Sequence, residues 1–213
     1  PSVDFGSEVK KRSISTEFVA LLARLLTRQG NRVGALFYGD HVDTVIPARG
    51  GRRHVLQLLH RLLSRPELPR SGATDLREFL RTAFQIMRRR SLVFIVSDFF
   101  SKHGWAEPLA HLTQRHEVVA VRLFDPLERE LPDMGMLVMQ DSETGEQLFV
   151  DTHDRTFRRR FASVAERRER ELRTALSRAG VDCLELATDG ELMDAVMRFT
   201  ELRKRRSRLA GGG

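Results

Sequence analysis

Three oxygen-bearing side chains stand where a parallel sheet would bring them together. Asp98 directly follows the strand-like run 92–96, and Thr74 lies in the loop that opens the helix before that run. Ser2 belongs to a short polar segment at the start of the chain. Ligands of parallel sheets collect at the carboxyl ends of the strands, where neighbouring loops converge. Hard cations such as Mg²⁺ bind carboxylate and hydroxyl oxygens, so these residues are candidates for a metal site.

A capping role is the alternative for two of these residues. Thr74 followed by Asp75 is a common sequence at a helix start, and Asp98 also precedes a predicted helix. Side-chain oxygens at such positions accept hydrogen bonds from the first free backbone N–H groups of the helix. The position of Asp98 after a buried strand favours the ligand interpretation, because that end of the sheet faces the ligand crevice. For Thr74 both interpretations stand.

The elements that would position these residues alternate along the chain. Continuous apolar runs predict strands at 33–38, 92–96, 118–124 and 181–186, with 33–38 and 118–124 buried on both faces. Apolar residues at helical spacing predict helices over 55–63, 76–87, 105–115 and 154–179. The same spacing predicts a first helix that begins after Ser15 or Thr16 and a last helix that begins at Leu192. This alternation predicts an α/β fold with a mainly parallel central sheet and helices on both faces.

Two antiparallel hairpins interrupt the alternation. Val42, Thr44 and Ile46 alternate with polar residues, which predicts a hairpin partner for 33–38. The runs 136–140 and 147–150 flank a short polar loop that ends in Gly145, a pattern typical of a hairpin. We expect residues 1–202 to form a single domain. The basic segment and the three glycines that follow predict a flexible tail over 203–213.

Five segments of the chain, taken together, carry a family resemblance. They are Asn31–Asp40, Gly51–Leu56, Leu92–Phe99, and Asp125–Pro132 with Asp141–Gly145. The combination resembles the bacterial domain-of-unknown-function family fifty-eight over nearly the whole chain. That family carries a von Willebrand factor A-like, Rossmann-like domain, and its members are commonly encoded beside MoxR-type AAA+ ATPases. None of the five segments is a catalytic signature.

The resemblance implies a metal-ion-dependent adhesion site (MIDAS). In von Willebrand factor A domains this site binds Mg²⁺ through an Asp-x-Ser-x-Ser loop after the first strand, a threonine from a second loop and an aspartate after a later strand. Ser2 would be the second serine, Thr74 the threonine and Asp98 the aspartate. The first Asp, the first Ser and the first strand would then precede Pro1. A partner's acidic residue would fill the open position on the metal.

By the same resemblance we expect a non-enzymatic interaction module. Its partners would be a MoxR-type AAA+ ATPase and a protein client, and its role the assembly or activation of protein complexes. The residues agree with this expectation, because the sequence contains neither a Gly-x-Ser-x-Gly elbow nor a Walker A pattern.

The charge balance suggests a different function. The 213 residues carry 36 Lys and Arg against 29 Asp and Glu, a formal net charge of +7. The surplus gathers in 158–173 and in 203–208, so a nucleic-acid-binding protein that uses its basic C-terminal helices is the alternative. Glu166, Glu169 and Glu171 interleave with the arginines at helical spacing, which favours a solvated helix face instead.

Cysteine usage and hydropathy predict the compartment. Cys183 is the single cysteine, which excludes an internal disulfide framework and a Cys-rich zinc site. Apolar runs stay well short of the roughly 20 residues that span a bilayer. We therefore expect a soluble, cytoplasmic protein without a transmembrane segment.

Overall fold

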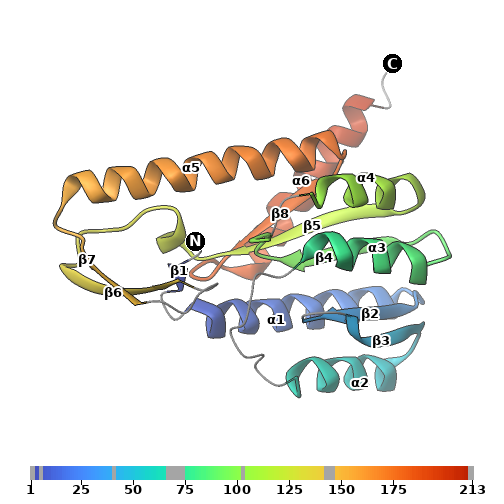
Figure 1. Ribbon diagram of the computed structural model, residues 1–213. Coiled ribbons are helices and arrows are strands. Elements are labelled where there is room, and N and C mark those ends of the chain that lie inside the picture. The colour runs from blue at the N-terminus through green and yellow to red at the C-terminus, as the bar shows by residue number, and fades with distance from the viewer. Residues whose placement is uncertain are drawn as a thin grey trace.

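The computed structural model describes residues 3–4, 7–39, 42–65, 75–101, 104–141 and 147–210. Helices and strands are arranged in layers (Figure 1). The helices are α1 (Ser7–Arg28), α2 (Arg52–Leu63), α3 (Leu76–Ile86), α4 (Ala106–Arg115), α5 (Arg155–Arg178) and α6 (Leu192–Ala210). The strands are β1 (Val3–Asp4), β2 (Val33–Tyr38), β3 (Val42–Arg49), β4 (Leu92–Ser97), β5 (Glu117–Phe124), β6 (Met136–Asp141), β7 (Gln147–Asp151) and β8 (Asp182–Ala187). A short 3-10 helix, η1 (Pro126–Glu128), follows β5.

Three of the predicted strands form a parallel sheet in the order β4-β5-β8. The middle strand, β5, pairs in parallel with both of its neighbours. Every residue of β5 from Val118 to Phe124 is buried, because helices cover both faces of the sheet. The predicted α/β fold with a parallel sheet is therefore confirmed.

Alternation along β5 sends side chains into two separate apolar clusters. Val118 and Ala120 pack with residues of α3, α4 and α5 on one face. Val119 and Val121 pack with residues of α1 and α6 on the other face. The strand therefore carries the core of the domain on both of its sides, and polar groups at its end are held by a rigid support.

Two antiparallel hairpins lie outside the parallel sheet, as the sequence predicts. β2 and β3 form a two-stranded sheet, and β6 and β7 form a three-stranded sheet with β1. The prediction that 33–38 is buried on both faces is wrong. Within β2, which the structure describes in full, only Phe37 is buried. The reason is that β2 has β3 as its one strand partner among the described residues.

α1 begins earlier than the sequence predicts. The expected caps, Ser15 and Thr16, lie inside a helix that starts at Ser7. The Thr16 hydroxyl donates a hydrogen bond to the carbonyl oxygen of Arg12, 2.8 Å away, one turn back. A hydroxyl that bonds back in this way is compatible with a helix interior, so it did not mark the start. The additional turns carry Lys11.

α6 extends further than the sequence predicts. The backbone is helical through Ala210, in place of a flexible tail that begins at residue 203. Lysine and arginine are good helix formers, so a basic run does not end a helix. The three glycines 211–213 lie outside the described residues.

His116, at the end of α4, should make the stability of the protein depend on pH. The ring is buried, and burial together with the charge of Arg115 lowers the pKa of the imidazole. The unfolded chain therefore binds the proton more readily, and the free energy of unfolding should fall as the pH drops below about 6.5. We expect His116→Leu to reduce this loss in urea unfolding at pH 7.5 and 5.5. His60→Gln, on the exposed side of α2, is the control, and equal losses in wild type and His116→Leu would contradict the prediction.

Among the helices that the structure describes, none combines the length and the apolar character that a membrane span requires.

Candidate functional site

Asp98 lies at the carboxyl end of β4, where the sequence places it. Its Oδ1 atom accepts a hydrogen bond from the backbone N–H of Phe100, 3.0 Å away. This bond closes a local turn. The next helix, α4, begins later and has Trp105 at its N-cap position. The capping alternative for Asp98 is therefore wrong.

The other two predicted metal ligands, Ser2 and Thr74, lie outside the described residues, so their part in a metal set stays a prediction. The capping alternative for Thr74 is wrong, because the next residue occupies the N-cap position of α3. Asp75 is the N-cap of α3, and its side chain accepts a hydrogen bond from the backbone N–H of Glu78 at 3.2 Å.

A tight turn fixes the direction of Asp98. Phe99 has a φ of 60°, a left-handed conformation that is strained for a bulky residue. Its backbone N–H donates to the Ser97 hydroxyl at 3.0 Å, and its buried ring packs against Trp105 with 5.7 Å between centroids. Packing of the aromatic pair holds the strained residue in place, so Asp98 is presented by a rigid support.

Lys11 of α1 and Glu128 of η1 meet Asp98 at this edge of the sheet. The Lys11 Nζ atom lies 2.5 Å from Glu128 Oε1 and 3.7 Å from Asp98 Oδ2. Nζ also lies 5.5 Å from the centroid of the Phe100 ring, within range of a cation–π contact. We call Lys11, Asp98 and Glu128 the carboxyl-edge site.

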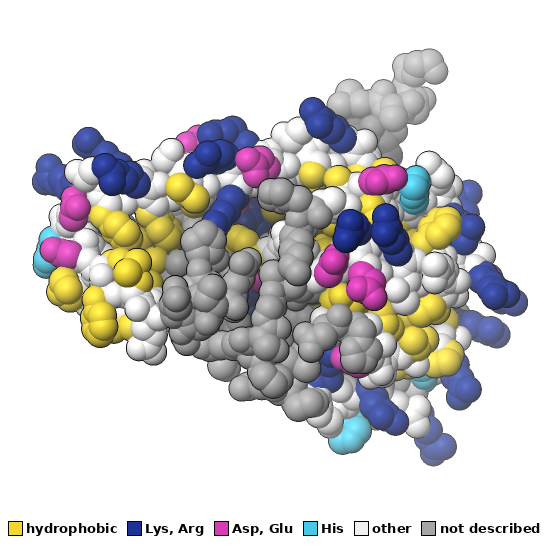
Figure 2. All heavy atoms as spheres, in the orientation of Figure 1, with side chains coloured by type: hydrophobic (Ala, Val, Ile, Leu, Met, Phe, Trp, Pro, Cys, Tyr) yellow, Lys and Arg dark blue, Asp and Glu magenta, His cyan; other side chains and the backbone are white. Residues whose placement is uncertain are grey.

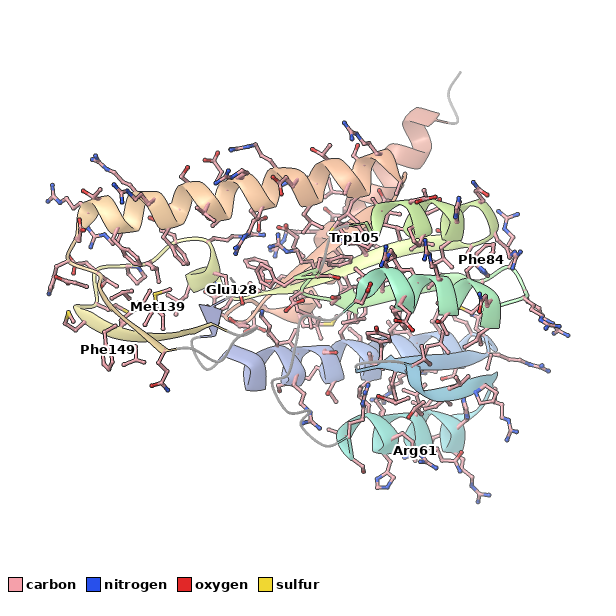
Figure 3. The ribbon with its side chains drawn as sticks, viewed as in Figure 1. Arg61, Phe84, Trp105, Glu128, Met139 and Phe149 are labelled. Carbon is pink, nitrogen blue, oxygen red and sulfur yellow. The ribbon has the colours of Figure 1, made fainter. Side chains whose placement is uncertain are left out.

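Glu128, labelled in Figure 3, is the most deeply buried member of this site, because only 6% of its side chain is exposed. Its Oε2 atom accepts a hydrogen bond from the backbone N–H of Asp125 at 3.3 Å, as part of a capping box that begins η1. Burial raises the pKa of Glu128, and the charge and hydrogen bond of Lys11 oppose that rise without cancelling it.

Asp125 joins the ends of two strands. Its Oδ1 atom accepts the backbone N–H of Leu127 at 2.9 Å, and its Oδ2 atom accepts the hydroxyl of Thr188 at 2.7 Å. Thr188 directly follows β8, so the bond ties the end of β5 to the end of β8. The carboxyl edge of the sheet is thus a connected polar surface.

The described residues of this edge do not fit a hard cation. Both oxygens of Asp98 and both of Glu128 already face a donor: Lys11 or a backbone N–H group. Across the part of the chain that the structure describes, no group of three or more His, Cys, Asp and Glu side chains is arranged to hold a metal ion. The position between the two carboxylates is taken by an ammonium group.

A second charged group is buried between β5 and α5. The guanidinium of Arg122 donates two hydrogen bonds to the carboxylate of Glu169 in a bidentate pair. Arg129 lies 3.2 Å from Glu169 and 2.9 Å from Glu185, and its guanidinium lies 3.6 Å from the Phe124 ring centroid. Burial raises the pKa of Glu169, but the bonds and charge of Arg122 outweigh it and leave that pKa below its usual value. The group links β5, η1, β8 and α5.

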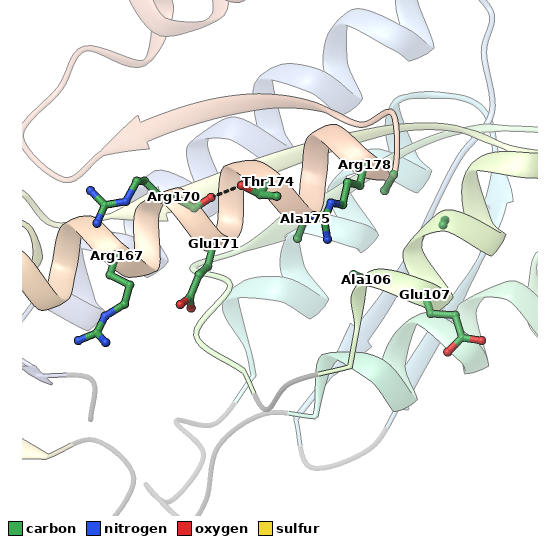
Figure 4. Close-up of a pocket in the computed structure, with 10 residues that line it drawn as sticks. Ala106, Glu107, Arg167, Arg170, Glu171, Thr174, Ala175 and Arg178 are labelled. Carbon is green, nitrogen blue, oxygen red and sulfur yellow. Dashed lines mark hydrogen bonds between the residues drawn. The ribbon is translucent and has the colours of Figure 1, made fainter.

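An open groove of about 530 Å³ runs between α4 and α5 (Figure 4). Alanines of both helices line it together with charged side chains of both signs, which are Glu107, Arg167, Arg170, Glu171 and Arg178. Arg170 pairs with Glu166 one turn away at 2.7 Å. This pair agrees with a solvated helix face at Glu166 and Arg170. For Glu169, which the sequence interpretation included in that face, the prediction is wrong, because its side chain is buried against Arg122.

Comparison with known proteins places the chain. Residues 1–171 match the family described as "Protein of unknown function DUF58". The chain belongs to this family. An uncharacterized protein of Mycobacterium tuberculosis is 33% identical over 99% of this chain, which spans 66% of that relative's length, less than two thirds of it. An uncharacterized protein of Mycobacterium avium is 35% identical over 79% of this chain and 98% of its own length.

One solved structure also resembles this member of the family. It is the conserved hypothetical protein BatB from Bacteroides thetaiotaomicron, at a TM-score of 0.46 and 12% sequence identity. The likeness covers 89% of this chain and 88% of that one.

Sequence reasoning located Asp98 but missed its partners. Lys11 was missed because α1 was expected to begin after it, and Glu128 lies 117 residues further along the chain. Arg122 did carry a signal, since it is the one charged residue in the apolar run 118–124. A charge in a buried strand demands a buried partner, which helix α5 supplies through Glu169.

Proposed function

We propose that this domain is a non-enzymatic protein-interaction module that works with a MoxR-type AAA+ ATPase in the assembly or activation of a client protein complex. The proposal follows from the family to which the chain belongs and from the resemblance of that family to von Willebrand factor A-like domains. One observation on the surface supports it, the outer face of the hairpin formed by β6 and β7.

This hairpin face consists of Met136, Val138 and Phe149. Val138 and Phe149 are directly opposed in the antiparallel register, so their side chains lie on the same side of the sheet. All three side chains are exposed, and Phe149 is 71% exposed to solvent. Figure 2 shows hydrophobic side chains gathered over this hairpin, with arginine side chains of α5 above them. Exposed apolar groups gathered in this way mark interaction sites.

The opposite side of the hairpin is anchored. Met139 and Val150 are buried and pack with Phe157 and Phe161 of α5. In Figure 3, Met139 lies on the side toward α5 and Phe149 on the outward side. The hairpin face is therefore presented on a supported platform, which lowers the entropic cost of binding a partner.

We also propose a von Willebrand factor A-like arrangement in which a further strand lies between β2 and β4. Among the described residues, β2 pairs with β3 and β4 pairs with β5, so each strand has one unpaired edge. The backbone N–H and C=O groups of such an edge favour the addition of a strand. Both β2 and β4 are rich in apolar residues, as expected for strands that lie inside a sheet.

Substitution of Phe149 tests the proposed function. We expect Phe149→Ser to weaken the binding of a purified MoxR-type AAA+ ATPase from the same organism by at least about tenfold, because a large aromatic anchor is typical of a binding hot spot. Biolayer interferometry on the immobilised protein would measure the dissociation constant.

Leu63→Ser is the matched control for this experiment. Leu63 is 61% exposed at the end of α2, away from the hairpin face, so its replacement should leave the affinity unchanged. Wild-type protein that fails to bind the ATPase would overturn the proposed function. Equal affinities of Phe149→Ser and wild type would show that the hairpin face takes no part in binding the ATPase.

Nucleic-acid binding remains the competing prediction, and salt distinguishes the two. If the basic helices held phosphates, the logarithm of the affinity for a duplex should fall linearly and steeply with the logarithm of salt concentration, as counterions are released. Apolar contacts through Phe149 predict an affinity for the ATPase that changes little over the same range.

A further inference from the structure

We propose that the ammonium group of Lys11 is the resident cation of the carboxyl-edge site, so that it takes the place of a divalent metal ion between Asp98 and Glu128. The inference concerns the site itself and holds whether or not the protein binds a MoxR-type ATPase.

The geometry places the ammonium group where a shared cation would lie. Lys11 Nζ contacts one oxygen of each carboxylate, at 2.5 Å from Glu128 and 3.7 Å from Asp98. The side chain of Lys11 is 13% exposed and that of Glu128 is 6% exposed. Charges this deeply buried are stable when they are paired and hydrogen-bonded. Lys11 therefore supplies the positive charge that lets the two carboxylates lie at one edge.

The remaining oxygens are also engaged. Asp98 Oδ1 accepts a hydrogen bond from the backbone N–H of Phe100, and Glu128 Oε2 accepts one from the backbone N–H of Asp125. A divalent ion at this position would have to displace the ammonium group from both carboxylates, because two positive charges at such short range repel each other strongly. The site is thus closed to Mg²⁺ as long as Lys11 is present.

α1 makes the arrangement rigid. Lys11 lies in the second turn of α1, and Phe18 of the same helix is buried against β5 in the apolar cluster that includes Val119 and Val121. The lysine therefore approaches the sheet edge from a packed helix. In consequence, removal of its charge should expose two carboxylates that are already held together.

Metal binding to the whole protein tests the proposal. Mn²⁺ alone is the probe, and its free concentration is followed by electron paramagnetic resonance as protein is added. We expect wild type to show no Mn²⁺ binding that depends on Asp98, whereas Lys11→Met should bind one Mn²⁺ at least about tenfold more tightly than wild type. The gain should disappear in the double variant Lys11→Met/Asp98→Asn.

Two controls keep the result decisive. Arg24→Met removes one positive charge from an exposed position of the same helix, so it should leave Mn²⁺ binding as in wild type. Circular dichroism confirms folding, and Lys11→Gln replaces Lys11→Met if the latter does not fold. Mn²⁺ binding by wild type that Asp98→Asn abolishes would overturn the proposal. So would a Lys11 variant, folded but with no gain in affinity.

Discussion

Arg122→Leu should lower the free energy of unfolding by about 3–5 kcal/mol, because it leaves the buried carboxylate of Glu169 without its bidentate partner. Arg129 and Arg173 would still lie 3.2 Å and 3.8 Å from Glu169, but neither replaces the two buried hydrogen bonds that Arg122 donates. Loss of a buried hydrogen-bonded ion pair is among the largest single-residue effects in proteins. Urea unfolding followed by the fluorescence of Trp105 would measure the change. Trp105 is the single tryptophan of the chain and is buried in the cluster beside α4 and α5.

Two further variants separate burial from charge. Arg122→Leu/Glu169→Leu should recover most of the lost stability, because it also removes the buried carboxylate that has lost its bidentate partner. Arg170→Leu breaks the exposed pair with Glu166 on the same helix and should cost about 0.5 kcal/mol or less. If Arg122→Leu costs no more than Arg170→Leu, the buried pair does not link the strand to the helix.

Leu58→Ala should lower the free energy of unfolding by about 2–5 kcal/mol, because it leaves a cavity in a packed interface. Leu58 is 1% exposed on α2, the helix that packs against α1 and β2. Urea unfolding again provides the measurement. A loss of this size would show that α2 and the β2–β3 hairpin unfold together with the parallel sheet.

The same helix offers a control of the same residue type. Leu56, two positions earlier, is 56% exposed, so Leu56→Ala should change the stability by no more than about 0.5 kcal/mol. Similar losses for the two variants would contradict the packing that the structure shows at α2.

Elements made by local patterns could be predicted from the sequence. The alternation of apolar runs with helical patterns identified the parallel sheet of β4, β5 and β8. The continuous apolar run of β5 also predicted its burial on both faces. The same rule failed for β2, which is as apolar as the others. Burial depends on the neighbours of a strand, and those are fixed by the whole fold.

The limits of helices were harder to predict than their existence. The helical spacing of α2 was correct, and yet Leu63, which continues the pattern, is exposed at its end. Ser15 and Thr16 suggested a helix start because such residues are common caps, but their hydroxyls are also compatible with a helix interior. The position of Asp98 in the site followed from its place directly after an apolar strand, whereas its ion pair with Lys11 could not be predicted.

Ion pairs between distant elements leave little trace in a single sequence. Lys11 and Glu128 are ordinary surface residue types, and nothing in their separation along the chain indicates contact. Arg122 differs because a charge inside an apolar strand is unusual. Sequence alone predicted that the carboxyl edge would be polar, but only the fold determined which charges meet there.

α5 connects two parts of the domain that have no strand pairing with each other among the described residues. The helix has 24 residues and is therefore about 36 Å long. Its first half is fixed to the β6–β7 hairpin through Phe157 and Phe161, and its second half to the sheet through Leu176. Glu169 lies between these two anchors, clamped to Arg122. One continuous helix therefore joins all three contacts and links the β6–β7 hairpin structurally to the parallel sheet.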